Sequence, residues 1–119
     1  MTNQEIANTL VELCRKGDFE KALKDLYADN AVSIEANASP AFEKETKGLP
    51  ALLEKGKKFD SMIEKVHSIT TSDPIVAGNS FACTMHLNAT MKEQGIMDMT
   101  ELCVYEIKDG KIISEQFFM

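Results

Sequence analysis

The chain has 119 residues, a length that suits one domain over residues 1–119 with a single hydrophobic core. Hydrophobic residues make up 44% of the sequence and charged residues 27%, which is typical of an ordered globular protein and excludes a disordered one. The net charge of −6 repels phosphate backbones and anionic lipids, so we expect neither nucleic-acid binding nor membrane-surface binding.

Cysteine usage and the N-terminal composition indicate the cellular compartment. Cys14, Cys83 and Cys103 are scattered through apolar stretches, which predicts buried, reduced thiols and not a disulfide framework. No cysteines or histidines have the spacing of a zinc site, and we expect neither a metal nor another cofactor. Residues 1–13 mix polar with apolar side chains, unlike a secretory signal, so the prediction is a cytoplasmic protein.

Two helices are predicted at the start of the chain. Thr2 and Glu5 have the spacing of a capping box, and apolar residues then recur at helical spacing until Gly17, which favours a helix end. Asp18 can cap a second amphipathic helix, which runs to about Tyr27. Two short helices cannot bury their apolar faces alone, so they require a partner layer.

A more irregular region follows the second helix. The sequence predicts a turn at residues 29–30, a strand over residues 31–36, and a polar loop with some extended structure over residues 37–47. Pro50 suits the first turn of a third helix. The buried stripe of this helix consists of Leu49, Leu52, Leu53 and Phe59.

From Met62 onward the apolar period changes from that of a helix to that of a strand. The predicted strands cover residues 62–71, 75–91 with a break at 78–79, 96–107 and 112–119. Helices followed by strands indicate an α+β fold, in which the helices of the N-terminal half pack on a mostly antiparallel sheet.

The first hairpin sets which side chains share a face. A turn centred on residues 93–94 places His86 opposite Glu101, and cross-strand partners share a face. The face expected to look inward carries a mixed polar set: Thr84, His86, Asn88, Met97, Met99, Glu101, Cys103 and Tyr105.

The second hairpin has two possible registers. A two-residue turn at Asp109 and Gly110 places Gln116 opposite Cys103, whereas a three-residue loop with a bulge at Gly110 places Glu115 there. We favour the bulged form, which turns Ile113, Glu115, Phe117 and Met119 inward. The opposite, more apolar face has no helix left to cover it, so we expect a homodimer through this outer sheet face.

Three stretches together resemble the nuclear transport factor 2-like superfamily, and its SnoaL-like members in particular. They are residues 17–32, the helix start at Gly48 and Leu49, and residues 104–112 with the ending Glu115-Gln116-Phe117-Phe118. The resemblance implies a cone-shaped fold whose strongly curved sheet wraps the helical layer, encloses a pocket and dimerises through its outer face. The superfamily includes ketosteroid isomerases, polyketide cyclases, dehydratases and non-catalytic binding domains, so it specifies fold better than function.

The same resemblance gives Glu35 a candidate role. It matches by position the acid with which ketosteroid isomerases abstract a proton beside a carbonyl, and an apolar pocket would raise its pKa toward neutrality. The alternative is a surface carboxylate at a strand end. The isomerase's tyrosine donor falls near Leu10 or Val11, and its protonated acid falls near Cys103. These residues are poor donors, so we do not expect ketosteroid isomerase activity.

His86 and Glu101 form the second candidate, because a carboxylate beside an imidazole raises the His pKa and sets its tautomer. The alternative is a half-buried pair whose members simply satisfy each other. Glu115 and Cys103 come third; a Cys–His nucleophilic site formed by Cys103 and His86 ranks below acid–base use. The facing of His67 stays open.

The predicted function is a small-molecule-binding domain with cofactor-free acid–base chemistry: isomerisation, cyclisation or dehydration. The predicted catalytic residues are Glu35, His86 and Glu101. The predicted pocket is lined by Thr84, Asn88, Met99, Cys103, Tyr105, Glu115, Phe117 and Met119. The alternative is a non-catalytic dimeric module that binds a ligand or another protein.

Overall fold

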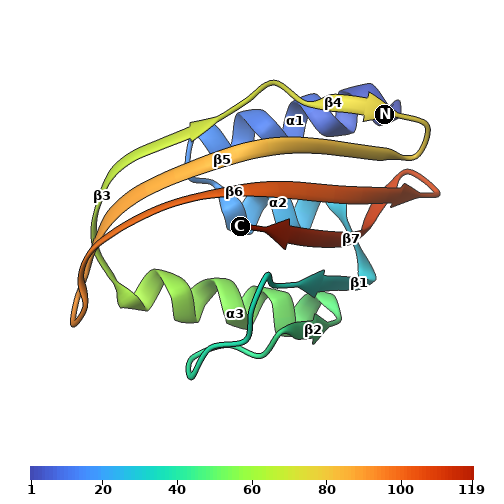
Figure 1. The fold of residues 1–119 in the computed structure, drawn as a ribbon. Helices are drawn as coiled ribbons and strands as arrows, with labels where there is room; N and C mark the ends of the chain where they lie inside the picture. Colours follow the sequence, from blue (N-terminus) through green and yellow to red (C-terminus); the bar gives the residue numbers. More distant parts are fainter.

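The computed structural model describes all 119 residues and has the predicted α+β fold: three helices pack on a mostly antiparallel, curved and unclosed seven-stranded sheet (Figure 1). The helices are α1 (Asn3–Arg15), α2 (Phe19–Leu26) and α3 (Leu49–Met62). The strands are β1 (Tyr27–Ile34), β2 (Glu45–Lys47), β3 (Ile63–Thr71), β4 (Ile75–Ala77), β5 (Ser80–Met91), β6 (Gly95–Lys108) and β7 (Lys111–Phe118). None of the helices is long and apolar enough to cross a membrane.

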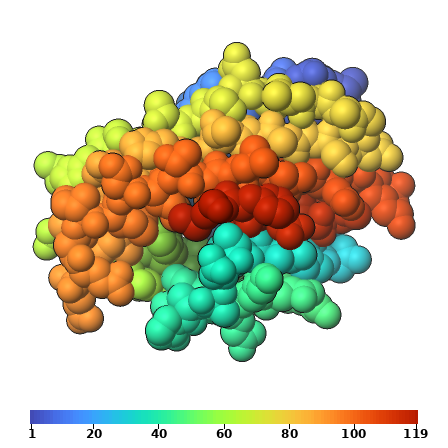
Figure 2. Space-filling view, viewed as in Figure 1, coloured from blue at the N-terminus to red at the C-terminus, as the bar shows by residue number.

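The sheet has the strand order β2-β1-β7-β6-β5-β3, with β4 paired to the other end of β5. Only β1 and β7 are parallel, so the first strand joins the last one at the centre of the fold. The long strands β5 and β6 curve across the molecule. The end that carries the β5–β6 loop bends toward the C-terminal end of α3, where β3 begins (Figure 1). In the space-filling view β5, β6 and β7 occupy the front and α1 lies behind them, so the sheet has a helix-covered inner face and an outer face (Figure 2).

Local signals explain where the helices begin and end. The capping box is present: Thr2 Oγ1 accepts from the Glu5 amide at 3.1 Å, and the Thr2 amide donates to the Glu5 carboxylate at 2.8 Å. Gly17 follows α1 with a φ of +75°, a left-handed conformation that favours glycine. Pro50 lies in the first turn of α3.

The chain between α2 and α3 differs from the prediction at one point. The turn expected at residues 29–30 is wrong, because both residues lie in β1, which begins directly after α2. The register between β1 and β7 shifts between Tyr27 and Val32. The polar residues 29–30, which suggested a turn, therefore lie in an irregular part of this strand. The expected extended structure in the polar loop is confirmed as β2.

The β5–β6 hairpin also corrects the prediction. Met91 pairs with Gly95, so the connecting loop has three residues and not the symmetric two or four that place Lys92 opposite Gly95. The physical reason is the φ of +76° at Gly95, the left-handed residue that closes a three-residue hairpin loop. The register is one residue away from the prediction, and a slip of one residue moves every side chain of a strand to the other face.

Because of this slip, the side chains of β5 face the opposite way from the prediction, whereas those of β6 face as predicted. Met85 is the partner of Glu101, and Thr100 is the partner of His86. His86 therefore lies on the outer face, and its predicted inward pairing with Glu101 is wrong. Thr84 and Asn88, predicted to face the pocket, share the outer face with His86 because they alternate with the buried residues of β5. These buried residues are Phe81, Cys83, Leu87, Ala89 and Met91.

The β6–β7 hairpin reaches the predicted facing by a different route. Asp109 and Gly110 form a two-residue turn with positive φ at both positions, 52° and 76°. A register shift between Glu106 and Ile107 then leaves one extra residue, Ile113, on the β7 side. Glu115 consequently pairs with Tyr105 and not with Cys103, although it still faces inward as predicted.

The main core of 17 buried residues lies between the inner face and the helices. Ile6 and Leu10 of α1 and Ile112 of β7 are fully or almost fully buried there. A smaller cluster of Leu87, Ala89 and Met91 lies toward the β5–β6 loop, where Phe59, Met97 and Met99 pack against it.

We predict that Ile112→Ala destabilises the protein by about 2–5 kcal/mol, because it removes buried methyl groups and leaves a cavity beside the bulge. Ile96→Ala is the matched control, since Ile96 is 65% exposed and its truncation is expected to change stability by about 0.5 kcal/mol or less. Urea unfolding measures both variants. Equal effects of the two substitutions would contradict the buried position of Ile112.

Candidate functional site

A buried carboxyl group, that of Glu115, lies at the centre of the inner face. The Tyr27 hydroxyl donates to one of its oxygens, and the Ser33 hydroxyl donates to the other at 2.6 Å. Ser33 and Glu115 are register partners on the parallel strands β1 and β7, which explains how Ser33 reaches the carboxyl group. Burial raises the pKa of Glu115, while the hydrogen bonds from Ser33 and Tyr27 lower it; the net shift is upward.

Lys55 continues this network toward the surface. It projects from α3, and its ammonium donates to the Ser33 hydroxyl at 2.9 Å and forms an ion pair with Glu35. The ammonium also lies 5.9 Å from the centre of the Phe117 ring. Lys55 and Glu35 have only 18% and 26% of their side chains exposed. A continuous chain of polar contacts therefore runs from Glu35, just beyond the end of β1, to the core at Glu115.

Glu101 is the second buried carboxyl group, with 8% of its surface exposed. Its one hydrogen-bond donor is the Cys103 thiol, 3.9 Å away, and thiols are weak donors. Burial raises the pKa of Glu101 to about 7, with further upward contributions from the charges of Glu35 and Glu115; Lys55 opposes them. Glu101 is thus close to half ionised at neutral pH.

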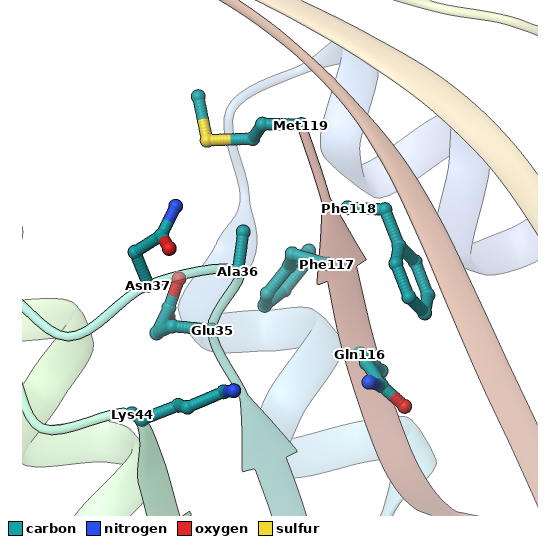
Figure 3. A pocket seen from close by; sticks show the side chains of 8 residues that line it. All are labelled: Glu35, Ala36, Asn37, Lys44, Gln116, Phe117, Phe118 and Met119. Atoms are coloured by element: carbon teal, nitrogen blue, oxygen red, sulfur yellow. The ribbon is translucent and has the colours of Figure 1, made fainter.

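A surface depression of about 290 Å³ lies where the end of β1 meets the end of β7. In Figure 3 the side chains of Glu35 and Phe117 extend toward the same space from their adjacent backbones, while Phe118 points to the other side of β7. Four of its eight lining residues are apolar; the full set is Glu35, Ala36, Asn37, Lys44, Gln116, Phe117, Phe118 and Met119. Leu102 pairs with Phe118, so Glu101 lies level with the end of the chain, although it does not itself line the depression.

The structure brings together part of the predicted site. Glu35, Glu101, Cys103, Tyr105, Glu115 and Phe117 all point to the inner face, with Met119 exposed at the rim. Tyr105 is packed in the core, where its ring stacks on Phe81 at 4.6 Å between centroids. Met99 also faces inward, but it packs in the smaller apolar cluster.

The remaining predicted residues lie on the outer face. Thr84 is exposed there, and the His86 ring contacts the Asp98 carboxylate in place of Glu101. His67, whose facing was open, contacts the Thr90 hydroxyl at 2.6 Å. His86 is therefore separated by the sheet from the carboxyl groups that it was expected to assist.

Three residues of the network were missed from the sequence: Tyr27, Ser33 and Lys55. Ser33 is two residues from Ala31 and two residues from Glu35. Side chains two residues apart in a strand share a face, so the strand period alone was enough to place Ser33 on the same face as Glu35. Lys55 follows the buried Leu52 by three residues, so the helical period places it at the edge of the buried face of α3. No group of three or more His, Cys, Asp or Glu side chains is arranged to hold a metal ion.

Comparison with known proteins identifies the family. The model of the SnoaL-like domain matches residues 1–119. The chain belongs to the SnoaL-like domain family. No curated protein matches its sequence.

Solved structures of SnoaL-like and related proteins share the fold. A proposed SnoaL-like polyketide cyclase from Mesorhizobium loti is 33% identical, with 100% of each chain covered and a TM-score of 0.92. A proposed isomerase from Bacillus subtilis is 20% identical, with 99% of this chain and 88% of that chain covered and a TM-score of 0.76. IdmH, a proposed polyketide cyclase from Streptomyces antibioticus, is 18% identical, with coverage of 99% and 91% and a TM-score of 0.72.

In this SnoaL-like domain we predict that Glu101 makes stability depend on pH. Its pKa is about 7 when folded and 4.5 ordinarily, so the folded state holds the proton more tightly. Stability from this group is complete below pH 4.5 and is lost as pH rises through 7, a loss on the order of 3 kcal/mol. Glu101→Gln removes this loss, so the variant gains stability relative to the wild type between pH 5 and pH 8. Urea unfolding at several pH values measures the difference.

Glu106→Gln is the matched control for this titration. Glu106 lies on the same strand but is exposed on the outer face. Its replacement is expected to leave the pH dependence of stability unchanged. A parallel shift of both variants at every pH would show that the folded-state proton is not held by Glu101.

Proposed function

We propose that this SnoaL-like domain is a cofactor-free acid–base enzyme that moves a proton beside a carbonyl group of a compact, partly apolar substrate. The observation that carries the proposal is Glu101, a buried carboxyl group with a pKa of about 7 and no strong donor, on which the charge of the half-buried Lys55 ammonium acts. A base whose pKa is near the working pH combines the correct protonation state with sufficient basicity.

Glu101 is the proposed proton acceptor. Glu35, the base expected from the sequence, is held in an ion pair with Lys55, so its carboxylate is already engaged. Each oxygen of Glu115 already accepts a hydrogen bond from a hydroxyl group. Glu101 has only the weak Cys103 thiol donor, so it is the carboxyl group more free to receive a substrate proton and to return it at a second position.

Lys55 is the proposed stabiliser of negative charge on the substrate oxygen. Proton removal beside a carbonyl produces an enolate, which requires a donor or a cation at its oxygen. The positions expected to supply donors hold Leu10, Val11 and Cys103, and Lys55 offers a cation from a different element, α3. Glu35 and Ser33 hold its ammonium in place, so its orientation costs little when the substrate binds.

The depression at the ends of β1 and β7 is the proposed entrance. Its volume of about 290 Å³ is at the lower end of the range for small-molecule sites, and its lining is half apolar. Phe117 and Met119 offer apolar contacts, while Glu35 leads toward Lys55. The 33% identical relative from Mesorhizobium loti, described as a proposed polyketide cyclase, supports cyclisation or isomerisation of a carbonyl compound.

We predict that Glu101→Gln lowers kcat about 10²–10⁴-fold for a carbonyl substrate. The substrate is first found by thermal shift with a panel of compact ketones and β-dicarbonyl compounds, because a bound ligand raises the melting temperature by mass action. With the wild type, kcat/KM is expected to rise with pH to a plateau, with a midpoint near 7, because the base is active when ionised.

His86→Gln is the matched control, because His86 lies on the outer face with Asp98 and has no access to the proposed site. Its activity and ligand-induced thermal shift are expected to equal those of the wild type. Loss of activity in His86→Gln with retention in Glu101→Gln would reject the assignment. Binding without turnover in the wild type would favour the non-catalytic module.

A homodimer through the outer face is the second part of the proposal. Exposed or half-exposed apolar side chains gather there on neighbouring strands: Ile75, Leu102, Val104 and Phe118. A contiguous apolar patch on one sheet face is typical of a protein interface. The three free cysteines, all buried, support a reducing compartment such as the cytoplasm.

We predict that Leu102→Glu converts the dimer to a monomer, because it places a charge in the apolar centre of the interface. Val66→Glu is the control: Val66 is similarly exposed, 43% against 41%, but pairs with the inward-facing Ala89. Light scattering after size-exclusion chromatography measures the mass. A wild-type monomer, or a dimer that tolerates Leu102→Glu, would reject this interface.

A further inference from the structure

The three cysteines, far apart in sequence, meet in the core behind Glu101. Cys14 comes from α1, Cys83 from β5 and Cys103 from β6, and all three belong to one buried cluster. The proposed acid–base function uses none of the thiols as a reacting group. Two of them, Cys83 and Cys103, nevertheless lie directly opposite each other on neighbouring strands.

Cys83 and Cys103 are direct partners on the antiparallel strands β5 and β6. The Ile107 amide donates to the Asn79 carbonyl at 2.7 Å, which makes that residue pair a hydrogen-bonded one. Hydrogen-bonded and non-hydrogen-bonded pairs alternate, and the register is unbroken along these strands, so Cys83 and Cys103 also form a hydrogen-bonded pair. The Cα atoms of such a pair are about 5.5 Å apart, within the range that a disulfide spans.

The two thiols differ in acidity. The adjacent Cys103 side chain and the charge of Arg15 lower the pKa of Cys83, although burial opposes them. The adjacent Cys83 side chain and burial raise the pKa of Cys103, whose thiol donates to Glu101. Burial raises the pKa of Cys14 to about 12. Cys83 is therefore the thiol that ionises most readily, and Cys103 lies directly opposite it.

We propose that Cys83 and Cys103 form a peroxide-reactive dithiol, which closes to a reversible cross-strand disulfide. The Cys83 thiolate attacks hydrogen peroxide, and the O–O bond breaks to give a sulfenic acid and hydroxide, which takes a proton to become water. The Cys103 sulfur then attacks the Cys83 sulfur; the S–O bond breaks and a second water leaves with the Cys103 proton. The two thiols lose two electrons and two protons in total, and one peroxide is reduced to two waters.

The sheet geometry makes this disulfide easy to reopen. The Cβ atoms of directly opposed strand residues are about 4.5–5.5 Å apart and lie closest in non-hydrogen-bonded pairs, whereas a disulfide holds them about 3.5–4.5 Å apart. Closure therefore draws β5 and β6 together and strains the bond, and a strained disulfide is more readily reduced by thiols. The two residues are only 4% and 1% exposed, so the proposal requires a small oxidant such as hydrogen peroxide.

Disulfide formation also changes Glu101. The Cys103 thiol is its one hydrogen-bond donor, and an oxidised sulfur has no hydrogen to donate. Oxidation removes a contact that favours the ionised carboxylate, so the titration of Glu101 moves to higher pH.

The test treats the intact protein with a small excess of hydrogen peroxide and follows its mass. The expected product has lost the mass of two hydrogen atoms, and peptide mapping without reduction links the peptides that contain Cys83 and Cys103. Dithiothreitol is expected to restore the original mass and three free thiols. The Cys14→Ser variant is the control and is expected to form the same cross-link.

Cys83→Ser and Cys103→Ser are expected to abolish this cross-link, and Cys83→Ala and Cys103→Ala serve if the serine variants do not fold. Three outcomes overturn the proposal: a cross-link that contains Cys14, oxygen addition without cross-linking, or no reaction of the folded protein. None of these outcomes bears on the acid–base function, because the Glu101→Gln kinetics are measured with the reduced protein.

Discussion

The parallel pairing of the first strand with the last depends on one buried carboxyl group. Glu115 of β7 accepts hydrogen bonds from Tyr27 and Ser33, which both belong to β1. A buried carboxyl group without partners costs several kcal/mol, so its two donors specify which strand lies beside β7 and in which register. Lys55 extends the network to α3 through Ser33. The network thus positions the third helix over the same end of the sheet at which the surface depression opens.

This arrangement gives two carboxyl groups on the same face different environments. Glu115 has two hydroxyl donors within its network, whereas Glu101 has a single thiol at 3.9 Å. Burial raises the pKa of both, and strong hydrogen bonds oppose this shift only at Glu115. Glu115 is therefore tied into the contacts that hold β1 beside β7, whereas Glu101 has no comparable structural role in the hydrogen-bond network.

The sequence was sufficient for the order and type of most elements, because the change of apolar period at Met62 is strong and the capping box and glycine signals are local. It was not sufficient for the β5–β6 register. The alternation of Phe81, Cys83 and Leu87 with polar residues marked the core face of β5, but the symmetric turn placed these side chains outward. A single left-handed residue, Gly95, decides the register, and its conformation is not encoded by the strand pattern. The same register error placed His86 in the candidate site, although it lies on the outer face.

The inward facing of Glu115 and Phe117 on β7 was predicted correctly from an incorrect hairpin, whereas at the start of the strand Ile112 is buried and not the predicted Ile113. The tight Asp109–Gly110 turn would by itself have turned Gln116 inward, yet the bulge beside Ile107 restores the inward position of Glu115. A bulge costs a ladder hydrogen bond, so it persists where the register it produces is worth more. Here the gain is the pairing of Glu115 with the hydroxyl groups of β1, together with full burial of Ile112. The inward positions of Glu115 in the polar network and of Ile112 in the apolar core thus both depend on the bulge in the β6–β7 hairpin.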